Sequence, residues 1–374
     1  MAKRRRTRPA AERCARLRRA LRRRDVPAML LTDPVDVSYL SGFTGDDSWL
    51  LVGKGKGRLL TDSRFGEQAG VDCPDLAVTV RKGSLVEALA KIVQRKRLAH
   101  LGYDPEAVSV GLLSRLRKAL KGVGLVRVPD VASRLRLCKD PTELRTIRRA
   151  VAVAEEAWAV FRASIRLGTT EHRLAAELDH QMRLAGADGS AFPTIVAVDA
   201  SAARPHAIPG RTRLKRGSVL LVDFGAKVDG YVCDLTRVLF AGRIPRFVRR
   251  VYEVVHEAQA AGIARSGPGV AFTEVDAAVR HVIEKAGFGK RFRHGTGHGI
   301  GRKVHEGPGL APRGVKGQLE PGMVVTIEPG IYLRGRFGIR IEDDVLITPG
   351  GRTVLTRVEK DLDEMVLVPP SGRG

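Results

Sequence analysis

The sequence predicts an α/β protein of two domains, the second of which contains a duplicated α+β unit. The chain has 374 residues, more than a single hydrophobic core usually serves, so two domains of common size are expected. Strand-like runs alternate with helical patterns up to Cys138, which indicates a β/α domain. Beyond Cys138, two helices followed by a hairpin occur twice. We therefore expect a basic disordered arm over 1–12, a first domain over 13–138 and a second domain over 139–370.

The net charge of the chain is +24, and most of this surplus precedes Cys138. Residues 1–138 hold 29 Lys and Arg against 14 Asp and Glu, which accounts for +15 of the +24. A surplus of this size is typical of proteins with an anionic partner such as nucleic acid. Twelve basic residues fall within the first 24 positions, where Leu17 and Leu21 supply a helix-spaced apolar stripe. The sequence leaves open whether this segment associates with RNA or ribosomes or reflects an Arg-rich proteome.

The four cysteines are scattered along the chain and form neither CxxC pairs nor a dense framework. This usage favours a reducing cytoplasm and argues against a structural zinc site. The charged N-terminus has no apolar segment behind it, so it does not have the pattern of a secretory signal. No uninterrupted apolar run approaches the roughly 18 residues of a membrane span. We therefore expect a cytoplasmic protein without a membrane partner.

In the first domain, strands and helices are expected in turn. The segment VPAMLLTDPVDVSYLSGFTGDDSWLLVGKGKGRLLTDSRF alternates short apolar runs with Gly, Asp and Pro, which predicts strands joined by turns. Helical patterns cover 84–97 and 109–120, with an Ala-His-Leu-Gly-Tyr strand between them. The run of Gly53, Gly55 and Gly57 lacks a following helix and the Lys-Ser pair of a phosphate loop. We interpret this run as a hairpin turn.

The second domain is expected to begin with a long helix. Pro141 and Glu143 follow Asp140, and proline with an acidic residue in the first turn is typical of a helix N-terminus. Gly168 ends this helical pattern, and Gly-Pro-Gly separates the later pair of helices. The four expected helices run over about 141–167, from about 171, over about 246–265 and over about 273–285.

The segment SVLLVDFGAKVDGYVCDLTRVLF, residues 218–240, predicts a hairpin that carries two aspartates. Asp-Gly between two apolar, β-rich runs is a strong hairpin pattern. A turn centred between Val228 and Asp229 would place Asp223 opposite Asp234, with Cβ atoms roughly 4.5–5.5 Å apart. Two desolvated carboxylates this close would raise each other's pKa unless a cation lay between them. The hairpin alone leaves open that one of the two is only a turn or edge residue.

A glycine-rich loop further along the chain brings three histidines. The segment FRHGTGHGIGRKVHE contains His294, His298 and His305, and glycines allow the close backbone approach that would aim several imidazoles at one point. A lone histidine in such a loop is usually no ligand.

Two glutamates complete the set of candidate ligands. Glu328 follows the apolar run of MVVTIEPG, and Glu342 is expected inside the strand GIRIEDDVLIT. Arg340 lies two residues from Glu342, hence on the same face of that strand. Two Asp, two Glu and at least one His on strand ends suit a pair of hard or borderline divalent ions.

At these residues the chain resembles the pita-bread (M24-type) metallopeptidases, which include aminopeptidase P, prolidase and methionine aminopeptidase. The matching segments are VDFGAKVDGYVCDLTR, HGTGHGIGRKVHE, TIEPGIY and GIRIEDDVLIT. The segment DVSYLSGFTGDDSWLLV resembles the creatinase-type N-terminal domain. The resemblance therefore implies a creatinase-like β/α domain followed by a duplicated pita-bread catalytic domain. It also implies five metal ligands, namely Asp223, Asp234, His298, Glu328 and Glu342.

The motif TIEPGIY and the triplet Arg340-Ile341-Glu342 are similar to the proline-specific branch of the family. By this similarity, His206 and His305 line the substrate site and donate hydrogen bonds to the substrate and the oxyanion, and His294 is a third such histidine. Glu328 is the expected general base. Arg340 is expected to orient Glu342 or Asp234, with a plain strand salt bridge as the alternative. The context of His206 departs from the commoner pattern, because Ala207 stands where Gly is usual.

The resemblance implies a dinuclear metal-dependent exopeptidase that hydrolyses an N-terminal Xaa-Pro bond in dipeptides or longer peptides. It favours Mn²⁺, with Co²⁺ or Zn²⁺ as alternatives, and it implies a homodimer. Two other functions stay open. One is a non-catalytic pita-bread protein that binds RNA or ribosomes through its basic surface, and the other is a methionine aminopeptidase.

Overall fold

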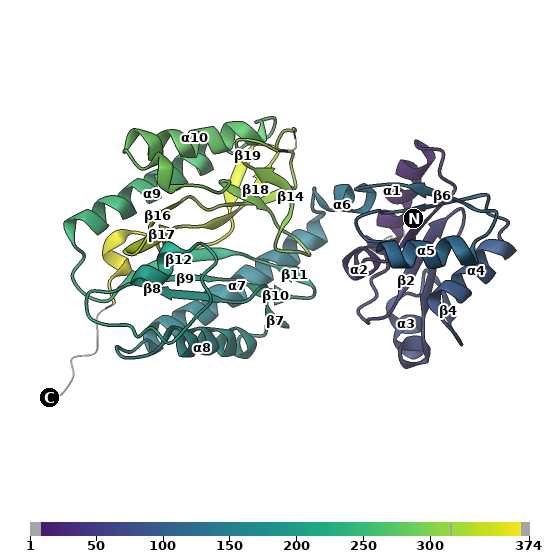
Figure 1. The fold of residues 1–374 in the computed structure, drawn as a ribbon, viewed down its shortest axis with the longest axis horizontal. Helices are drawn as coiled ribbons and strands as arrows, with labels where there is room; N and C mark the ends of the chain where they lie inside the picture. Colours follow the sequence, from purple (N-terminus) through teal and green to yellow (C-terminus); the bar gives the residue numbers. More distant parts are fainter. Residues whose placement is uncertain (1–8, 315, 368–374) are drawn as a thin grey trace, which may run out of the picture. The chain divides into compact units, whose positions relative to one another are not determined.

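The computed structural model describes residues 9–314 and 316–367, and the chain divides into two compact units, 1–136 and 137–374 (Figure 1). All four cysteines are free. Across the described ranges, no helix combines the length and the apolar character needed to cross a membrane.

The first unit is built on a six-stranded mixed sheet with the strand order β4-β3-β2-β1-β5-β6. Strands β1 and β2 are antiparallel, as are β2 and β3, whereas the other neighbours run parallel. The turn between β2 and β3 is the hairpin expected at the glycine run. The strands are β1 (Ala28–Leu31), β2 (Trp49–Gly53), β3 (Arg58–Thr61), β4 (Ala77–Val80), β5 (His100–Tyr103) and β6 (Gly124–Arg127). The helices are α1 (Pro9–Arg22), α2 (Pro34–Ser41), α3 (Gly66–Asp72), α4 (Leu85–Arg95), α5 (Val110–Ala119) and α6 (Val131–Arg136).

Helices cover both faces of this sheet. On β1, Met29 and Leu31 belong to one buried cluster, and Ala28 and Leu30 belong to another. This alternation follows from the two-residue period of a strand. The first cluster takes its helical residues from α1, α2, α3 and α6, and the second takes them from α4 and α5. The unit is therefore a three-layer α/β/α sandwich, which agrees with the β/α domain expected from the alternating pattern.

The N-terminal basic segment is helical from Pro9 onward. Its apolar stripe of Cys14, Leu17 and Leu21 is buried, as the helical spacing predicts. Residues 9–12 begin α1, so the expectation of a disordered arm is wrong for these four residues. The rest of the expected arm, residues 1–8, lies outside the described residues. The four residues are helical because the apolar stripe that anchors α1 begins immediately after them.

The second unit holds four long helices and four small sheets. The helices are α7 (Pro141–Ser164), α8 (Glu171–Leu184), α9 (Arg246–Arg265) and α10 (Phe272–Lys285). The strands of the first half are β7 (Gly189–Ser190), β8 (Ile195–Val198), β9 (Val219–Phe224), β10 (Ala226–Val228), β11 (Tyr231–Val232) and β12 (Leu235–Phe240). Those of the second half are β13 (Gly297–Gly299), β14 (Glu306–Leu310), β15 (Val324–Ile327), β16 (Gly330–Leu333), β17 (Phe337–Arg340), β18 (Asp343–Thr348) and β19 (Gly351–Val354).

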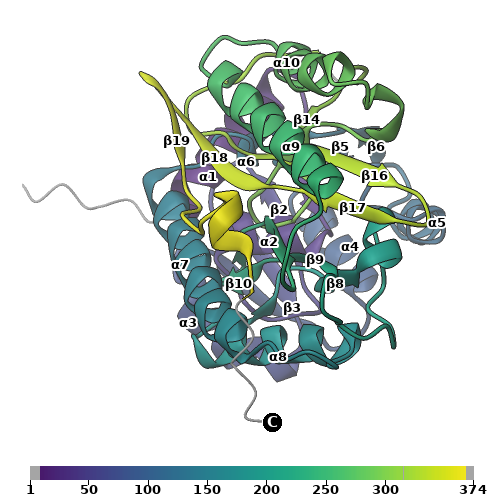
Figure 2. The same ribbon diagram turned by 90° about the vertical axis from the view of Figure 1, so that its left-hand side faces the viewer.

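The two halves of this unit repeat one arrangement. Helices α7 and α8 precede the antiparallel order β8-β9-β12, and α9 and α10 precede the corresponding order β13-β15-β18. In both views of the unit the strands lie between the pair α7 and α8 and the pair α9 and α10 (Figure 2). One large buried cluster contains residues of both halves. The duplication expected from the order of elements is thus present in three dimensions.

Helix α7 starts where the sequence indicates. Asp140 is its N-cap and accepts hydrogen bonds from the backbone N–H groups of Thr142 and Glu143, while the Glu143 carboxylate accepts from Asp140 N. This reciprocal capping box satisfies donors that the first helical turn leaves open. The helix ends at Ser164, three residues before the expected end, because Ile165 takes an extended conformation with φ −60° and ψ 132°.

A buried ion pair in the first unit yields a stability prediction. Asp36 of α2 pairs with Arg136 of α6, and both are buried. We expect Asp36→Ala to lower the free energy of unfolding by about 3–5 kcal/mol, because it removes the carboxylate from a buried guanidinium. Urea unfolding measures this change. The control is Glu274→Ala, whose exposed pair with Arg265 should contribute less than about 1 kcal/mol. Equal effects of the two substitutions would contradict the prediction.

Candidate metal centre

The hairpin that carries Asp223 and Asp234 has a different register from the expected one. Strands β9 and β12 pair Asp223 with Thr236, so Asp234 lies two residues along the partner strand instead of directly opposite. The turn is centred on Asp229 and Gly230, whose φ angles are 48° and 75°. The expected centre would have required a positive φ at Val228, which a β-branched residue avoids. Asp and Gly tolerate the two left-handed positions of this turn.

Glu328 and Glu342 lie at the corresponding places of the second half. Glu328 directly follows β15, as expected. The expectation of Glu342 inside a continuous strand is wrong, because the chain leaves β17 at Arg340 and enters β18 at Asp343. The break arises because β17 pairs with β16 whereas β18 pairs with β15. Glu342 instead forms an isolated bridge with Thr236 of β12, which joins the two halves.

The duplication therefore brings four carboxylates together as two pairs. In each half, one acid lies at the end of the middle strand, Asp223 on β9 and Glu328 after β15. The other directly precedes the third strand, Asp234 before β12 and Glu342 before β18. Because the middle and third strands are antiparallel, the end of one lies beside the start of the other.

These acids form part of the lining of a cavity of about 500 Å³ in the second unit. The lining includes every residue that the sequence analysis singled out for the site, namely His206, Asp223, Asp234, His294, His298, His305, Glu328, Arg340 and Glu342. They come from a loop before β9, from β9 to β12, from the glycine-rich loop around β13 and from β15 to β18.

His298 lies among the acids. Its Nε2 is 3.3 Å from Oε1 of Glu328 and 3.7 Å from Oδ2 of Asp234. Asp234, His298 and Glu342 each offer one ligand atom, and these atoms lie within 4.8 Å of one another. Three ligand atoms gathered in this way could hold a metal ion.

The donor set fits divalent cations on two further observations. One carboxylate oxygen of Asp223 and one of Asp234 are buried without a hydrogen-bond partner among the described residues. Burial raises the pKa of Asp234 and of Glu342 well above the ordinary value, and the neighbouring carboxylates raise both further. Acids that are costly to ionise and have unused lone pairs are ligands for a cation.

Arg340 binds Asp223 directly, whereas Glu342 or Asp234 was the expected partner. Its Nη2 is 2.5 Å from Oδ2 of Asp223, not next to Asp234. Its Nε donates to the hydroxyl of Thr236, which in turn donates to Glu342 at 2.6 Å. Arg340 thus reaches Glu342 through a hydroxyl. The reason is the register of β12, which places Thr236 opposite Asp223 and beside Glu342 at once.

The sequence analysis assigned no role to Tyr332, which the structure places between two of the site residues. Arg340 Nη1 donates to the Tyr332 hydroxyl at 2.9 Å, and Nε2 of His294 lies 3.0 Å from that hydroxyl. Nδ1 of His294 is 2.8 Å from the carbonyl of Gly295 and must donate to it, so Nε2 accepts from the tyrosine. His294 lines the cavity with both ring nitrogens engaged. Tyr332 lies in the motif TIEPGIY, on the strand after Glu328, and this position could have identified it as a site residue.

His206 and His305 lie at the opening of the cavity, and both are exposed. The His305 ring packs against the His298 ring, with centroids 4.3 Å apart. Partial burial lowers the pKa of His305, and the nearby imidazoles lower it further. Its ring is therefore neutral at pH 7.

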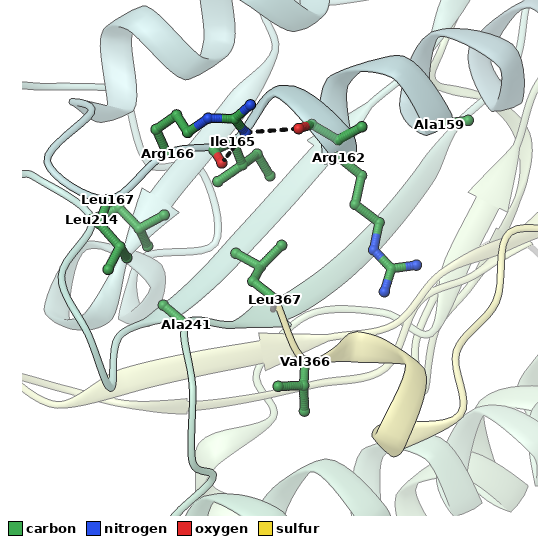
Figure 3. A pocket seen from close by; sticks show the side chains of 10 residues that line it. Ala159, Arg162, Ile165, Arg166, Leu167, Leu214, Ala241, Val366 and Leu367 are labelled. Carbon is green, nitrogen blue, oxygen red and sulfur yellow. Dashed lines mark hydrogen bonds between the residues drawn. The ribbon is translucent and has the colours of Figure 1, made fainter. Parts of the chain in front are cut away.

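A second cavity, of about 420 Å³, lies between the end of α7, Leu214, Ala241 and residues 366–367 (Figure 3). The described residues that line it include no acid and no histidine. Its two arginines are Arg162 and Arg166, and Nη1 of Arg166 donates to the carbonyls of Ala163 and Ile165. This cavity lacks the groups that hydrolysis requires.

Comparisons with known proteins agree with this geometry. Residues 145–349 match the model of metallopeptidase family M24, and residues 13–138 match the creatinase/prolidase N-terminal domain. The chain belongs to metallopeptidase family M24. An Xaa-Pro dipeptidase from Pyrococcus horikoshii is 32% identical over 344 residues, which is 90% of this chain and 94% of the relative.

Two solved structures extend this similarity to the whole M24 chain. An Xaa-Pro dipeptidase from Bacillus anthracis has a TM-score of 0.92 and 34% identity, and the match covers 96% of this chain and 100% of that one. An X-Pro aminopeptidase from Thermotoga maritima has a TM-score of 0.88 and 34% identity, with 95% and 99% covered. The predicted family and the two-domain fold with a pita-bread unit are confirmed.

The M24 ligand set predicts a change in metal content. We expect Asp234→Asn to retain less divalent metal than the wild type, because an amide is a weaker ligand than a carboxylate. The metal-free variant should be at least as stable as the metal-free wild type, since one repelling charge is gone. Elemental analysis and urea unfolding measure the two effects.

The control for this experiment is Asp229→Asn, in the turn of the same hairpin. Asp229 is exposed, and Asn tolerates its positive φ. Full metal content in Asp234→Asn would contradict the assignment of this ligand.

Arg340 is expected to affect the metal affinity of the site through the side chains that it binds, without contacting the metal itself. We expect Arg340→Lys to weaken metal binding about 10–100-fold, because a lysine cannot reproduce the hydrogen bonds to Asp223, Thr236 and Tyr332. Competition with a chelator measures this affinity. Arg352→Lys, which changes an arginine that donates to Ser266 O, should leave it unaltered. An unchanged affinity in Arg340→Lys would show that Asp223 needs no such support.

Proposed function

We propose that this M24 peptidase uses two divalent cations to hydrolyse the bond between an N-terminal residue and a following proline. The observation that carries the proposal is the convergence of Asp223, Asp234, Glu328, Glu342 and His298 on one cavity. The relatives named Xaa-Pro dipeptidase and X-Pro aminopeptidase support the choice of substrate.

The five converging residues would hold the cations. Bound there, a pair of cations would supply an activated water at neutral pH and polarise the scissile carbonyl. The oxygen-rich set favours Mn²⁺, and the single imidazole also admits Co²⁺ or Zn²⁺. Backbone positions at strand ends keep the acids in place before any ion arrives.

Glu328 is the proposed general base. Burial works to raise its pKa, but the hydrogen bond and the charge of His298 outweigh burial and lower it. Its carboxylate is therefore ionised and can accept a proton from water. The Thr326 hydroxyl donates to Oε1 of Glu328 at 3.3 Å and helps to orient it. The same carboxyl would then pass the proton to the leaving imino nitrogen of proline.

His206 and His305 are the proposed donors to the substrate. Both lie at the opening of the cavity, and the neutral His305 ring carries one N–H. Such a donor to a developing oxyanion is worth roughly 3–4 kcal/mol in comparable sites. His294, whose ring nitrogens are both engaged, is proposed to hold Tyr332 and, through it, Arg340.

Apolar side chains fit the proposed specificity for proline. Phe192, Pro193, Ile195 and Val304 line the same cavity as the acids. A prolyl ring has no N–H to donate and presents only methylene groups, so an apolar wall suits it.

We further propose that the enzyme is a homodimer in a reducing cytoplasm. Sedimentation tests the oligomeric state, and cell fractionation tests the location.

The purified enzyme with Mn²⁺ is expected to release glycine from Gly-Pro or from Gly-Pro-Xaa peptides and to leave Met-Ala intact. His298→Ala should lower kcat/KM by at least about 10³-fold, because it removes a ligand and the partner of Glu328. His281→Ala, in α10 and away from the cavity lining, is the matched control. Cleavage of Met-Ala in preference to Gly-Pro would favour methionine aminopeptidase activity. If no peptide is cleaved but RNA is retained on a filter in a salt-sensitive manner, the proposal fails in favour of a nucleic-acid role.

A further inference from the structure

Ile208 lines the catalytic cavity although 84% of it is exposed. Single exposed apolar residues are common on protein surfaces and need no explanation by themselves. Of the described large apolar residues that are exposed, however, Ile208 alone lies in this cavity. Because Ile208 shares this cavity with the proposed catalytic groups, we expect a bound substrate to cover its side chain.

The loop that carries Ile208 is held at both ends. Before it, the carbonyl of Pro205 accepts from Nη1 of Arg340 at 3.4 Å. After it, Gly210 N donates to the buried carboxylate of Glu171 at 2.9 Å, and Gly210 O accepts from the backbone of α8. Ala207, the neighbour of Ile208, is 4% exposed and packs into the core. The side chain is therefore presented to solvent by an anchored backbone.

The cavity has a buried floor and an exposed rim. Asp234 and Glu342 on the floor are 4% and 2% exposed. Phe192 and Val304 are half-buried, and Ile208 is exposed together with Pro193, His206 and His305. A peptide whose first bond is held at the floor must leave the cavity along this rim. On this rim, Ile208 offers an exposed apolar side chain to a residue after proline.

The charges of the lining support a substrate that continues past proline. Arg340 is the one Arg or Lys among the lining residues that the structure describes. Its guanidinium already donates to Asp223, Thr236, Tyr332 and Pro205. No uncommitted guanidinium or ammonium in this described lining is left for the terminal carboxylate of a dipeptide.

We propose that Ile208 binds the side chain of the residue that follows proline, so that the enzyme acts on peptides longer than two residues and prefers an apolar third residue. The inference rests on the proposed Xaa-Pro hydrolysis and specifies its substrate class. Ile208 would contribute in the ground state and the transition state alike, because it would contact a side chain that takes no part in the reaction. Its effect should therefore appear in KM and leave kcat unchanged.

The test compares Gly-Pro-Leu, Gly-Pro-Ser and Gly-Pro as substrates of the Mn²⁺ enzyme. In the wild type, KM for Gly-Pro-Leu should be about fivefold lower than for Gly-Pro-Ser, as expected when part of a leucine and part of an isoleucine leave water. In Ile208→Ser the two values should become equal, while kcat for each tripeptide stays the same. Leu184→Ser is the matched control, since Leu184 is 67% exposed and does not line the cavity.

Three results would overturn the inference. One is cleavage of Gly-Pro with no cleavage of either tripeptide, which leaves the proposed function intact. Another is an unchanged ratio of the tripeptide KM values in Ile208→Ser. The third is an effect of Ile208→Ser on Leu-Pro relative to Ser-Pro, which would place Ile208 against the first residue instead. Absence of cleavage of all these substrates would instead remove the proposed function itself.

Discussion

Four carboxylates that water barely reaches face one cavity in the second unit of this protein. Placed there without compensation, they would repel one another and destabilise the fold, and burial already raises the pKa of three of them, Asp223, Asp234 and Glu342. Arg340 compensates one acid directly, and His298 lies beside two more. The remaining negative charge is what makes the cavity a site for divalent cations. The rest of the unit can be understood as the framework that keeps these acids together.

This framework depends on a duplication. Each half places one acid at the end of a middle strand and another before the third strand, so neither half alone supplies the four carboxylates of the cavity. The bridge between Thr236 and Glu342 joins the halves at this level, and the Thr236 hydroxyl connects Arg340 with Glu342. A single residue of β12 thus couples the first pair of acids to the second. The packing of the two halves against each other consequently also determines how the four acids lie relative to one another.

The groups proposed to handle the substrate lie on loops, whereas the proposed metal ligands lie on or beside strands. His206, Ile208 and His305 occupy loop segments at the rim, and the backbone on either side of His206 and Ile208 is tied to the buried side chains of Arg340 and Glu171. This division suits a hydrolase of family M24, because rigid strands fix the ligands and loops can differ in the peptides they accept. The departure at Ala207 falls in such a loop. The chemistry of the family and the specificity of this chain are therefore encoded in separate segments.

The sequence was sufficient for the alternation of the first unit, for the capped start of α7 and for the bounds of α9, because these features depend on local patterns. It also identified the nine polar residues that line the cavity, since their motifs can be read without knowing which strands pair. It did not give the hairpin register, where Val228 was assigned a turn position that its branched side chain avoids. It also missed the break at Glu342, the role of Tyr332 and the partner of Arg340.

The partner of Arg340 depends on contacts between segments about 100 residues apart, such as Thr236 with Glu342, and the other three features depend on which strands pair. Local residue patterns determined which elements form and which side chains can bind metal. Only the tertiary structure decided which acid lies beside which basic side chain. The physical reason is that hydrogen bonds and burial between distant strands select one arrangement among those that the local patterns allow.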